Sequence, residues 1–360
     1  MKFKFQDRER ALRLTDLIGK HMPERELKLV HVCGTHEMAI TEHGLRSLLP
    51  KKLSILEGPG CPVCVTPTAD LDAALQLADR DVIVAAFGDM MRVPGTEYSL
   101  EELKSRGADV RVVYSADEAV KLARSSPERE IAFLSVGFET TAPMTAAVLA
   151  DGPPSNFSVI PANKLIPPAM EALMELPDNP VDGYLAPGHV STIIGTDPYQ
   201  IIASGYGLPV AVAGFEPLDI LYAIDLLLQK IAEGDAGVFN AYQRAVDREG
   251  NPRSLQLIEE VFLVDDAHWR GIGVIPDSGL FLRDDYSPFD ARKKFDLTRR
   301  SHQETLPNCL CPSVLTARAT PDQCDLFGEE CTPEHPHGPC MVGQEAMCNI
   351  WYRYGGRPSL

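Results

Sequence analysis

The stretch that decides the fold is IAFLSVGFETT, which runs from Ile131 to Thr141. Its first six residues form an apolar, β-prone run of strand length, and a polar segment opens directly after it at Gly137. The same order recurs along the first 230 residues, with amphipathic helical patterns between the apolar runs. The expected strands are residues 27–32, 53–57, 82–87, 110–113, 131–136, a strand around Val159, 183–186 and 209–213. Strands that alternate with helices predict an α/β fold with parallel sheets.

The number of expected strands exceeds one five-stranded unit, so we predict two Rossmann-like α/β lobes. The turn-forming residues 151–156 indicate a linker, which gives a first lobe over residues 1–150 and a second over 151–235. Residues 236–300 show helical patterns with one short strand and are expected to form a helical connecting region. Residues 301–360 are rich in Cys, Pro, Gly and His, and so poor in core formers that a metal or disulfides are expected to hold them.

Composition narrows the class of protein. The 360 residues are 44% apolar, which is ample for real cores, and no apolar run reaches the length of a membrane span. The charged N-terminus lacks the apolar centre of a signal peptide, so we expect a cytoplasmic protein. A net charge of −17 argues against a nucleic-acid partner, because phosphate binding needs a basic excess.

The nine cysteines fall into two groups. Cys33, Cys61 and Cys64 lie near the N-terminus, and the other six lie between Cys309 and Cys348. Structural disulfides are rare in the cytosol, so clustered cysteines there indicate metal binding or redox chemistry.

Polar or Gly-rich segments follow six of the expected strands. Because ligands bind at the carboxyl ends of parallel strands, these six segments predict one shared cleft. The segments are Cys33-Gly34-Thr35-His36-Glu37, Gly58-Pro59-Gly60-Cys61-Pro62-Val63-Cys64, Gly88-Asp89-Met90, Gly137-Phe138-Glu139-Thr140-Thr141, Pro187-Gly188-His189-Val190-Ser191 and Gly214-Phe215-Glu216.

Two of these segments contain cysteine. Cys61 and Cys64 have the spacing of a redox disulfide or of a metal grip, and a following helix would stabilise a thiolate. Cys33 and His36 suit a soft metal such as iron or zinc, or a Cys–His nucleophile pair. Buried structural cysteines and a core histidine are the alternatives.

The C-terminal cysteines fit neither a zinc ribbon nor the cysteine run of bacterial ferredoxins. Six exceed the need of one four-coordinate site, so four could hold a cluster while two form a redox pair, or some could be inert. His335 or His337 could replace one thiolate. The cysteines are Cys309, Cys311, Cys324, Cys331, Cys340 and Cys348.

Taken together and in this order, the motifs resemble the HypD family of hydrogenase maturation factors. The residues that carry the resemblance run from about 30 to 352: Cys-Gly-Thr-His-Glu from Cys33, Gly-Pro-Gly-Cys-Pro-Val-Cys-Val-Thr-Pro from Gly58, Gly-Phe-Glu-Thr-Thr-Ala-Pro from Gly137, Pro-Gly-His-Val-Ser from Pro187, Gly-Phe-Glu-Pro-Leu-Asp-Ile-Leu from Gly214, Leu326-Phe327-Gly328, Cys331-Thr332-Pro333-Glu334 and Cys340-Met341-Val342.

The resemblance implies two α/β lobes and a C-terminal [4Fe–4S] module. It implies a role, with the small protein HypC, as scaffold and redox partner for the Fe(CN)2CO group of nickel–iron hydrogenases, with cyanide supplied by HypE. In this reading Cys33 binds mononuclear iron that carries cyanide and carbon monoxide, and His36 lies close by. Cys61 and Cys64 act as a thiol/disulfide couple that relays electrons. No simple turnover reaction follows from the sequence.

The resemblance leaves the cysteines of the module unassigned, because Pro312-Ser313 and the run 341–348 depart from the family pattern. For the cluster we expect Cys311, Cys324, Cys331 and Cys348, with Cys309 close behind, and the role of Cys340 stays open. Glu139, His189 and Glu216 are expected in the cleft as cofactor-binding residues without assigned roles.

Two other classes of protein fit the cysteines. One is an iron–sulfur thiol–disulfide oxidoreductase that reduces a protein disulfide, and the other is a zinc-stabilised binding module.

Overall fold

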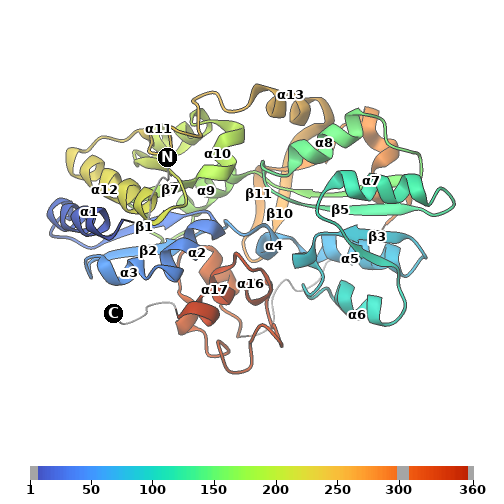
Figure 1. Cartoon of the computed structure of the whole chain (residues 1–360), viewed down its shortest axis with the longest axis horizontal. Helices are drawn as coiled ribbons and strands as arrows, with labels where there is room; N and C mark the ends of the chain where they lie inside the picture. The colour runs from blue at the N-terminus through green and yellow to red at the C-terminus, as the bar shows by residue number, and fades with distance from the viewer. Residues whose placement is uncertain (1–6, 298–307, 356–360) are drawn as a thin grey trace.

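The computed structural model describes residues 7–297 and 308–355 and places two parallel sheets side by side (Figure 1). The five-stranded sheet contains, in spatial order, β2 (Leu53–Glu57), β1 (Leu27–His31), β7 (Gly183–Pro187), β8 (Val210–Ala213) and β9 (Val238–Asn240). The four-stranded sheet contains β4 (Val110–Val112), β3 (Ile83–Ala86), β5 (Ile131–Gly137) and β6 (Phe157–Asn163). All neighbours in both sheets are parallel, which confirms the predicted α/β fold.

Helices cover both sheets. Around the five-stranded sheet lie α1 (Arg8–His21), α2 (Gly34–Glu42), α3 (Leu45–Leu48), α9 (Ile166–Met174), α10 (Gly188–Ile194), α11 (Gln200–Tyr206) and α12 (Pro217–Glu233). Around the four-stranded sheet lie α5 (Thr68–Ala78), α6 (Leu100–Ser105), α7 (Ala116–Ser125), α8 (Ala142–Ala150) and α13 (Pro252–Val261). Every residue of β5 is buried, as a continuous apolar run between two helical layers requires.

The boundary between the lobes differs from the prediction. β1 and β2 share a sheet with β7, β8 and β9 through the pairing of β1 with β7, so the chain leaves the five-stranded sheet after Glu57, builds the other sheet, and returns at Gly183. The boundary expected at residue 150 falls inside the four-stranded lobe, where residues 151–156 join α8 to β6. Gly152 has a φ of +70° there. Turn-forming residues close a helix–strand connection as readily as a domain boundary, so the pattern was misinterpreted.

The expected helical connecting region, residues 236–300, is wrong in its main feature. It holds α13 and α14 (Ala291–Lys294), but its centre is an antiparallel hairpin of β10 (Phe262–Trp269) and β11 (Gly273–Leu282) that runs between the lobes (Figure 1). Gly271 and Gly273 take positive φ angles of 77° and 117° in the turn, which suits glycine. The sequence did not predict this hairpin, because the residues that flank the two glycines do not strictly alternate between apolar and polar.

The C-terminal module consists of short helices that pack against the carboxyl edge of the five-stranded lobe (Figure 1). Its helices are α15 (Cys311–Leu315), α16 (Pro339–Val342) and α17 (Met347–Tyr354). α17 packs on α2, and α16 packs on α4 (Pro62–Val65). Among the described helices, none combines the length and the apolar character needed to cross a bilayer.

Candidate functional site

Cys33 lies at the junction of β1 and α2, where it occupies the position that caps the helix. Its side chain is 7% exposed, and burial raises the pKa of the thiol to about 12. The backbone N–H groups of His36 and Thr35 donate toward the sulfur and oppose that shift. A sulfur at a helix N-terminus is placed to carry negative charge once a cation replaces its proton.

His36 offers a nitrogen lone pair in the same place. Its Nε2 lies 3.0 Å from the carbonyl oxygen of Gly214 and 3.2 Å from that of Ala213. Carbonyl oxygens only accept, so Nε2 carries the proton and Nδ1 carries the lone pair. Nδ1 is buried and has no hydrogen-bond partner in the described part of the chain. Burial lowers the pKa of His36 to about 3, so the ring is neutral and available as a ligand.

Phe215 joins this histidine to a second one. The ring of Phe215 lies 5.3 Å from that of His36 and stacks on His189 with a centroid distance of 3.8 Å. His189 is exposed, whereas His36 is buried. The predicted site residues Cys33, His36 and His189, from the ends of β1 and β7, are therefore brought to one place.

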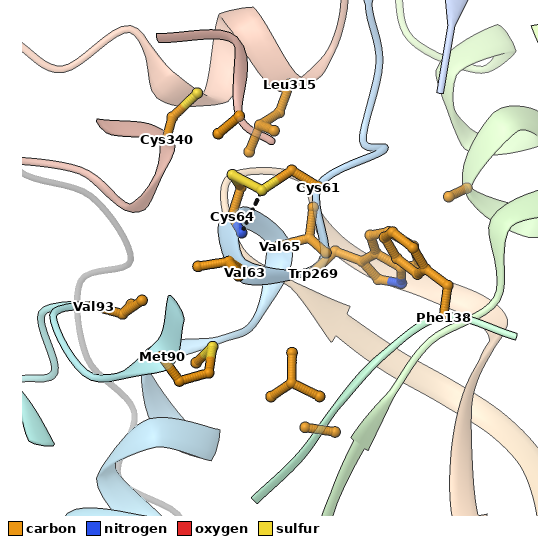
Figure 2. Packing of buried hydrophobic residues seen from close by; sticks show 14 of the residues in the cluster. Cys61, Val63, Cys64, Val65, Met90, Val93, Phe138, Trp269, Leu315 and Cys340 are labelled. Carbon is orange, nitrogen blue, oxygen red and sulfur yellow. Dashed lines mark hydrogen bonds between the residues drawn. A yellow bond between two sulfur atoms is a disulfide. The ribbon is translucent and has the colours of Figure 1, made fainter. Parts of the chain in front are cut away.

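Cys61 and Cys64 form a disulfide across the first turn of α4. Both are buried in the main hydrophobic core, and Figure 2 shows the disulfide with Val63 and Val65 on one side and Cys340 and Leu315 of the C-terminal module on the other. A Cβ added to Gly60 would lie 2.3 Å from the backbone nitrogen of Cys33, so only glycine lets the two sulfur-bearing loops approach so closely.

Glu345 of the C-terminal module reaches into the same region. Thr35 donates a hydrogen bond of 2.9 Å to its carboxylate. After burial, the charge of Glu345 is the next cause that raises the pKa of Asp89, and it also raises that of Cys33. At His189 it opposes the lowering by partial burial. The loops after β1, β3 and β7 therefore converge on one carboxylate.

The six cysteines of the module line one small pocket together with Leu310, Val314, Leu326, Phe327, Gly338 and Met341. Cys311 and Cys340 are buried and hydrogen-bond each other, and Cys340 also bonds to Cys348. In the described residues no three His, Cys, Asp or Glu side chains stand in ready metal-ligand geometry. Cysteine sulfurs in an apolar pocket are nevertheless the kind of ligand that holds an iron–sulfur cluster.

Two predicted cleft residues have local partners that explain them. The Oε1 atom of Glu139 accepts the backbone N–H of Ile166 over 2.9 Å at the start of α9, and burial raises the pKa of this carboxyl to about 7. Glu216 is the residue before α12, and its backbone N–H donates to Asp219 over 3.3 Å.

Three features escaped sequence reasoning. Phe215 sits in a motif that we had noted, but its place between two histidines needs the fold. Arg46 and Glu37 form a buried ion pair of 2.6 Å, and Glu57 is a buried carboxyl at the end of β2. An acidic residue directly before Gly58-Pro59-Gly60-Cys61 was the available signal for Glu57.

Comparison with known proteins gives consistent matches. The model of the HypD family, described as "Hydrogenase formation hypA family", matches residues 9–355. The chain is 43% identical over 364 residues to the hydrogenase maturation factor HypD2 of Bradyrhizobium diazoefficiens, covering 98% of this chain and 96% of the relative. It is 44% identical over 354 residues to HypD of Escherichia coli, covering 96% and 93%. It is 43% identical over 333 residues to a putative hydrogenase expression/formation protein of Methanocaldococcus jannaschii, covering 91% and 92%.

Proposed function

This chain belongs to the HypD family of hydrogenase maturation factors, and on that premise we propose that it assembles the Fe(CN)2CO group with a HypC-type partner. The observation that carries the proposal is that the Cys33 thiol and His36, whose Nδ1 is bare, lie together at one strand end. A thiolate and a neutral imidazole are donors that suit iron.

The protein's own residues prepare the site for an iron ion, which is cargo and not a resident cofactor. Cys33 stays protonated until iron arrives, because its pKa is about 12, and it loses its proton on binding. The N–H groups at the start of α2 then stabilise the thiolate. The Gly214 carbonyl accepts from Nε2 of His36, and Phe215 contacts the ring of His36 and stacks on His189.

The remaining coordination positions would be filled from outside the chain. Cys33 is a single thiolate, so a HypC-type chaperone would contribute further donors and a HypE-type protein would deliver cyanide. The loops that meet at Glu345 are the place where such partners would approach, because His189 is exposed there.

The C-terminal cysteines would hold a [4Fe–4S] cluster that supplies electrons when bound. The mutual hydrogen bond of Cys311 and Cys340 favours these two as a thiol pair. The ligands would then be Cys309, Cys324, Cys331 and Cys348, so Cys309 would replace Cys311 in the ligand set expected above. The Cys61–Cys64 disulfide lies between this module and the Cys33 loop and would act as the redox couple.

Infrared spectroscopy of the chain co-purified anaerobically with its HypC-type partner tests the proposal. We expect cyanide and carbonyl stretches in the wild type and their loss in Cys33→Ala. Survival of both stretches in Cys33→Ala would refute the role of this thiolate. Iron and sulfide assays on the same samples test the cluster, and a colourless protein that contains zinc would contradict it.

The same samples separate the second candidate function. The disulfide at Cys61 and Cys64 is the observation that favours a thiol–disulfide oxidoreductase. A cluster-containing protein without cyanide or carbonyl bands, but with a dithiol that reduces a protein disulfide, would support that function over iron assembly.

A further inference from the structure

A short segment that follows β9 packs against the loop that follows β8. It consists of residues 241–246, which belong to none of the polar segments that the sequence singles out. β9 pairs in parallel with β8, so the segment leaves the sheet at the same edge as the loop of residues 214–216. The backbone N–H of Tyr242 donates to the side chain of Asn240 over 2.9 Å, and its carbonyl accepts from the N–H of Val246 over 3.1 Å. The segment therefore holds the tyrosine in a fixed place beside the loop.

The ring of Tyr242 contacts both residues that lie against His36. Two of its carbons would be 2.7 Å from a Cβ on Gly214, and it stands edge-on to Phe215 with the ring centroids 5.9 Å apart. The centroid of Phe215 lies 5.3 Å from that of His36, and the Gly214 carbonyl accepts from Nε2 of the histidine over 3.0 Å. A side chain at position 214 would displace the tyrosine, so glycine is required there.

Asp219 holds the same loop. It lies in the first turn of α12 and is 7% exposed. Its Oδ2 atom accepts the backbone N–H of Glu216 over 3.3 Å, and the same oxygen would lie 2.3 Å from a Cβ on Gly214. The carboxylate and the tyrosine ring therefore pack together against the loop.

Arg244 joins the ring to the carboxylate. Its guanidinium donates to Asp219 through both terminal nitrogens, one of them over 2.8 Å, and its central carbon lies 4.5 Å from the centroid of the Tyr242 ring. A forked pair of bonds fixes the orientation of a carboxylate, and a planar guanidinium also stacks on an aromatic face. The side chain of Arg244 is 41% exposed, so it contributes little to the core.

We propose that Arg244 is a positioning residue of the iron site. By fixing Asp219 and Tyr242 it holds the loop after β8. In that conformation of the loop the Gly214 carbonyl accepts from Nε2 of His36, so the ring keeps its proton on Nε2 and presents the lone pair of Nδ1. This inference rests on the role proposed for His36 as a donor to iron, but the position of the proton can be measured without iron.

Nuclear magnetic resonance of His36 gives the test. The full chain is labelled with nitrogen-15 at histidine and kept anaerobic without added iron, and the signals of His36 are identified by their loss in His36→Gln. The nitrogen shifts report the ratio of the Nε2–H form to the Nδ1–H form at pH 7. We expect Arg244→Met to lower this ratio at least about fivefold, the factor that one net hydrogen bond contributes.

Further variants distinguish positioning from a general loss of stability. Arg244→Lys keeps the charge beside Asp219 but not the fork, so it should recover part of the ratio. Tyr242→Leu should lower the ratio, whereas Tyr242→Phe keeps the ring and should not change it. The matched control is Arg248→Met, which removes an exposed arginine–aspartate pair with Asp197 over 2.8 Å and should leave the ratio unchanged.

Infrared spectra of the same variants extend the test to the iron site. In the chain co-purified with its HypC-type partner, Arg244→Met should weaken the cyanide and carbonyl bands at least about fivefold, because fewer molecules present the lone pair of Nδ1. The far-ultraviolet circular dichroism should stay as in the wild type, since the substituted side chain lies largely outside the core.

An unchanged ratio in Arg244→Met would overturn the proposal, as would an equal fall in Arg248→Met or a wild-type His36 with its proton on Nδ1. Full cyanide and carbonyl bands in Arg244→Met despite a lowered ratio would overturn the link between the proton position and the iron site. Absence of both bands in the wild type, together with the expected change in the ratio, would count against iron assembly and leave the positioning of the ring in place.

Discussion

Replacing Arg46 by Met should destabilise the junction between the five-stranded lobe and the C-terminal module. The Arg46 side chain is 9% exposed and the Glu37 carboxylate is fully buried. Glu37 also accepts hydrogen bonds from Thr41 over 2.6 Å and from Trp351 of α17 over 2.8 Å, and it contacts His31 over 2.9 Å. Arg46 is the cation that makes this buried carboxylate tolerable, and Glu37 in turn anchors α17.

The expected loss in free energy of unfolding is about 3–5 kcal/mol, because removing one partner of a buried ion pair leaves the other charge uncompensated. Urea titrations at pH 7 measure it as a lower transition midpoint at an unchanged slope. The remaining hydrogen bonds of Glu37 keep the loss from exceeding this range.

The matched control is Glu37→Gln in the Arg46→Met background. It removes the orphaned charge but keeps a side chain that can accept from Trp351, so we expect it to recover at least half of the loss.

The pH dependence of stability in the acid range gives a second test. Burial would raise the pKa of Glu37, but Arg46 and His31 outweigh burial and hold it below the ordinary value. Its contribution is therefore present above about pH 4.3 and lost as the pH falls below it, and Arg46→Met should flatten that loss. A free energy of unfolding within about 0.5 kcal/mol of the wild-type value would refute the reasoning.

Two further substitutions test other parts of the structure. In Gly60→Ala the new Cβ would lie 2.2 Å from the Val32 carbonyl carbon, so we expect urea titrations to show a free energy of unfolding lower by at least about 2 kcal/mol. The control is Gly205→Ala in α11, where the new Cβ would meet nothing within 4 Å and should be neutral or stabilising. A tolerated Gly60→Ala would show that the loop beside Cys33 is not tightly packed. The wild-type protein should lose free energy of unfolding as Glu139 ionises, because burial raises the pKa of this carboxyl to about 7. The free energy of unfolding of Glu139→Gln, measured relative to wild type, should therefore rise by about 3 kcal/mol between pH 4 and 8. A difference that does not vary with pH would contradict that pKa.

The sequence by itself determined most of the elements and the family. Apolar runs followed by polar loops predicted β1 to β8 within a few residues, because local hydrophobic pattern and turn chemistry are written in consecutive residues. These loops contain the candidate site residues Cys33, His36, Cys61 and Cys64. The order of the loop motifs along the chain carried the resemblance to the HypD family.

Tertiary structure alone decided which strands share a sheet. β7 returns to pair with β1, a contact between residues about 150 positions apart, and no local pattern encodes such a partner. For the same reason the sequence placed the lobe boundary at a turn. The neutral His36 tautomer, the stack of Phe215 on His189, and the acid at Glu57 likewise depend on burial and on groups from distant segments. Burial changes the charge state and the pKa of a side chain, and burial is a property of the packed chain.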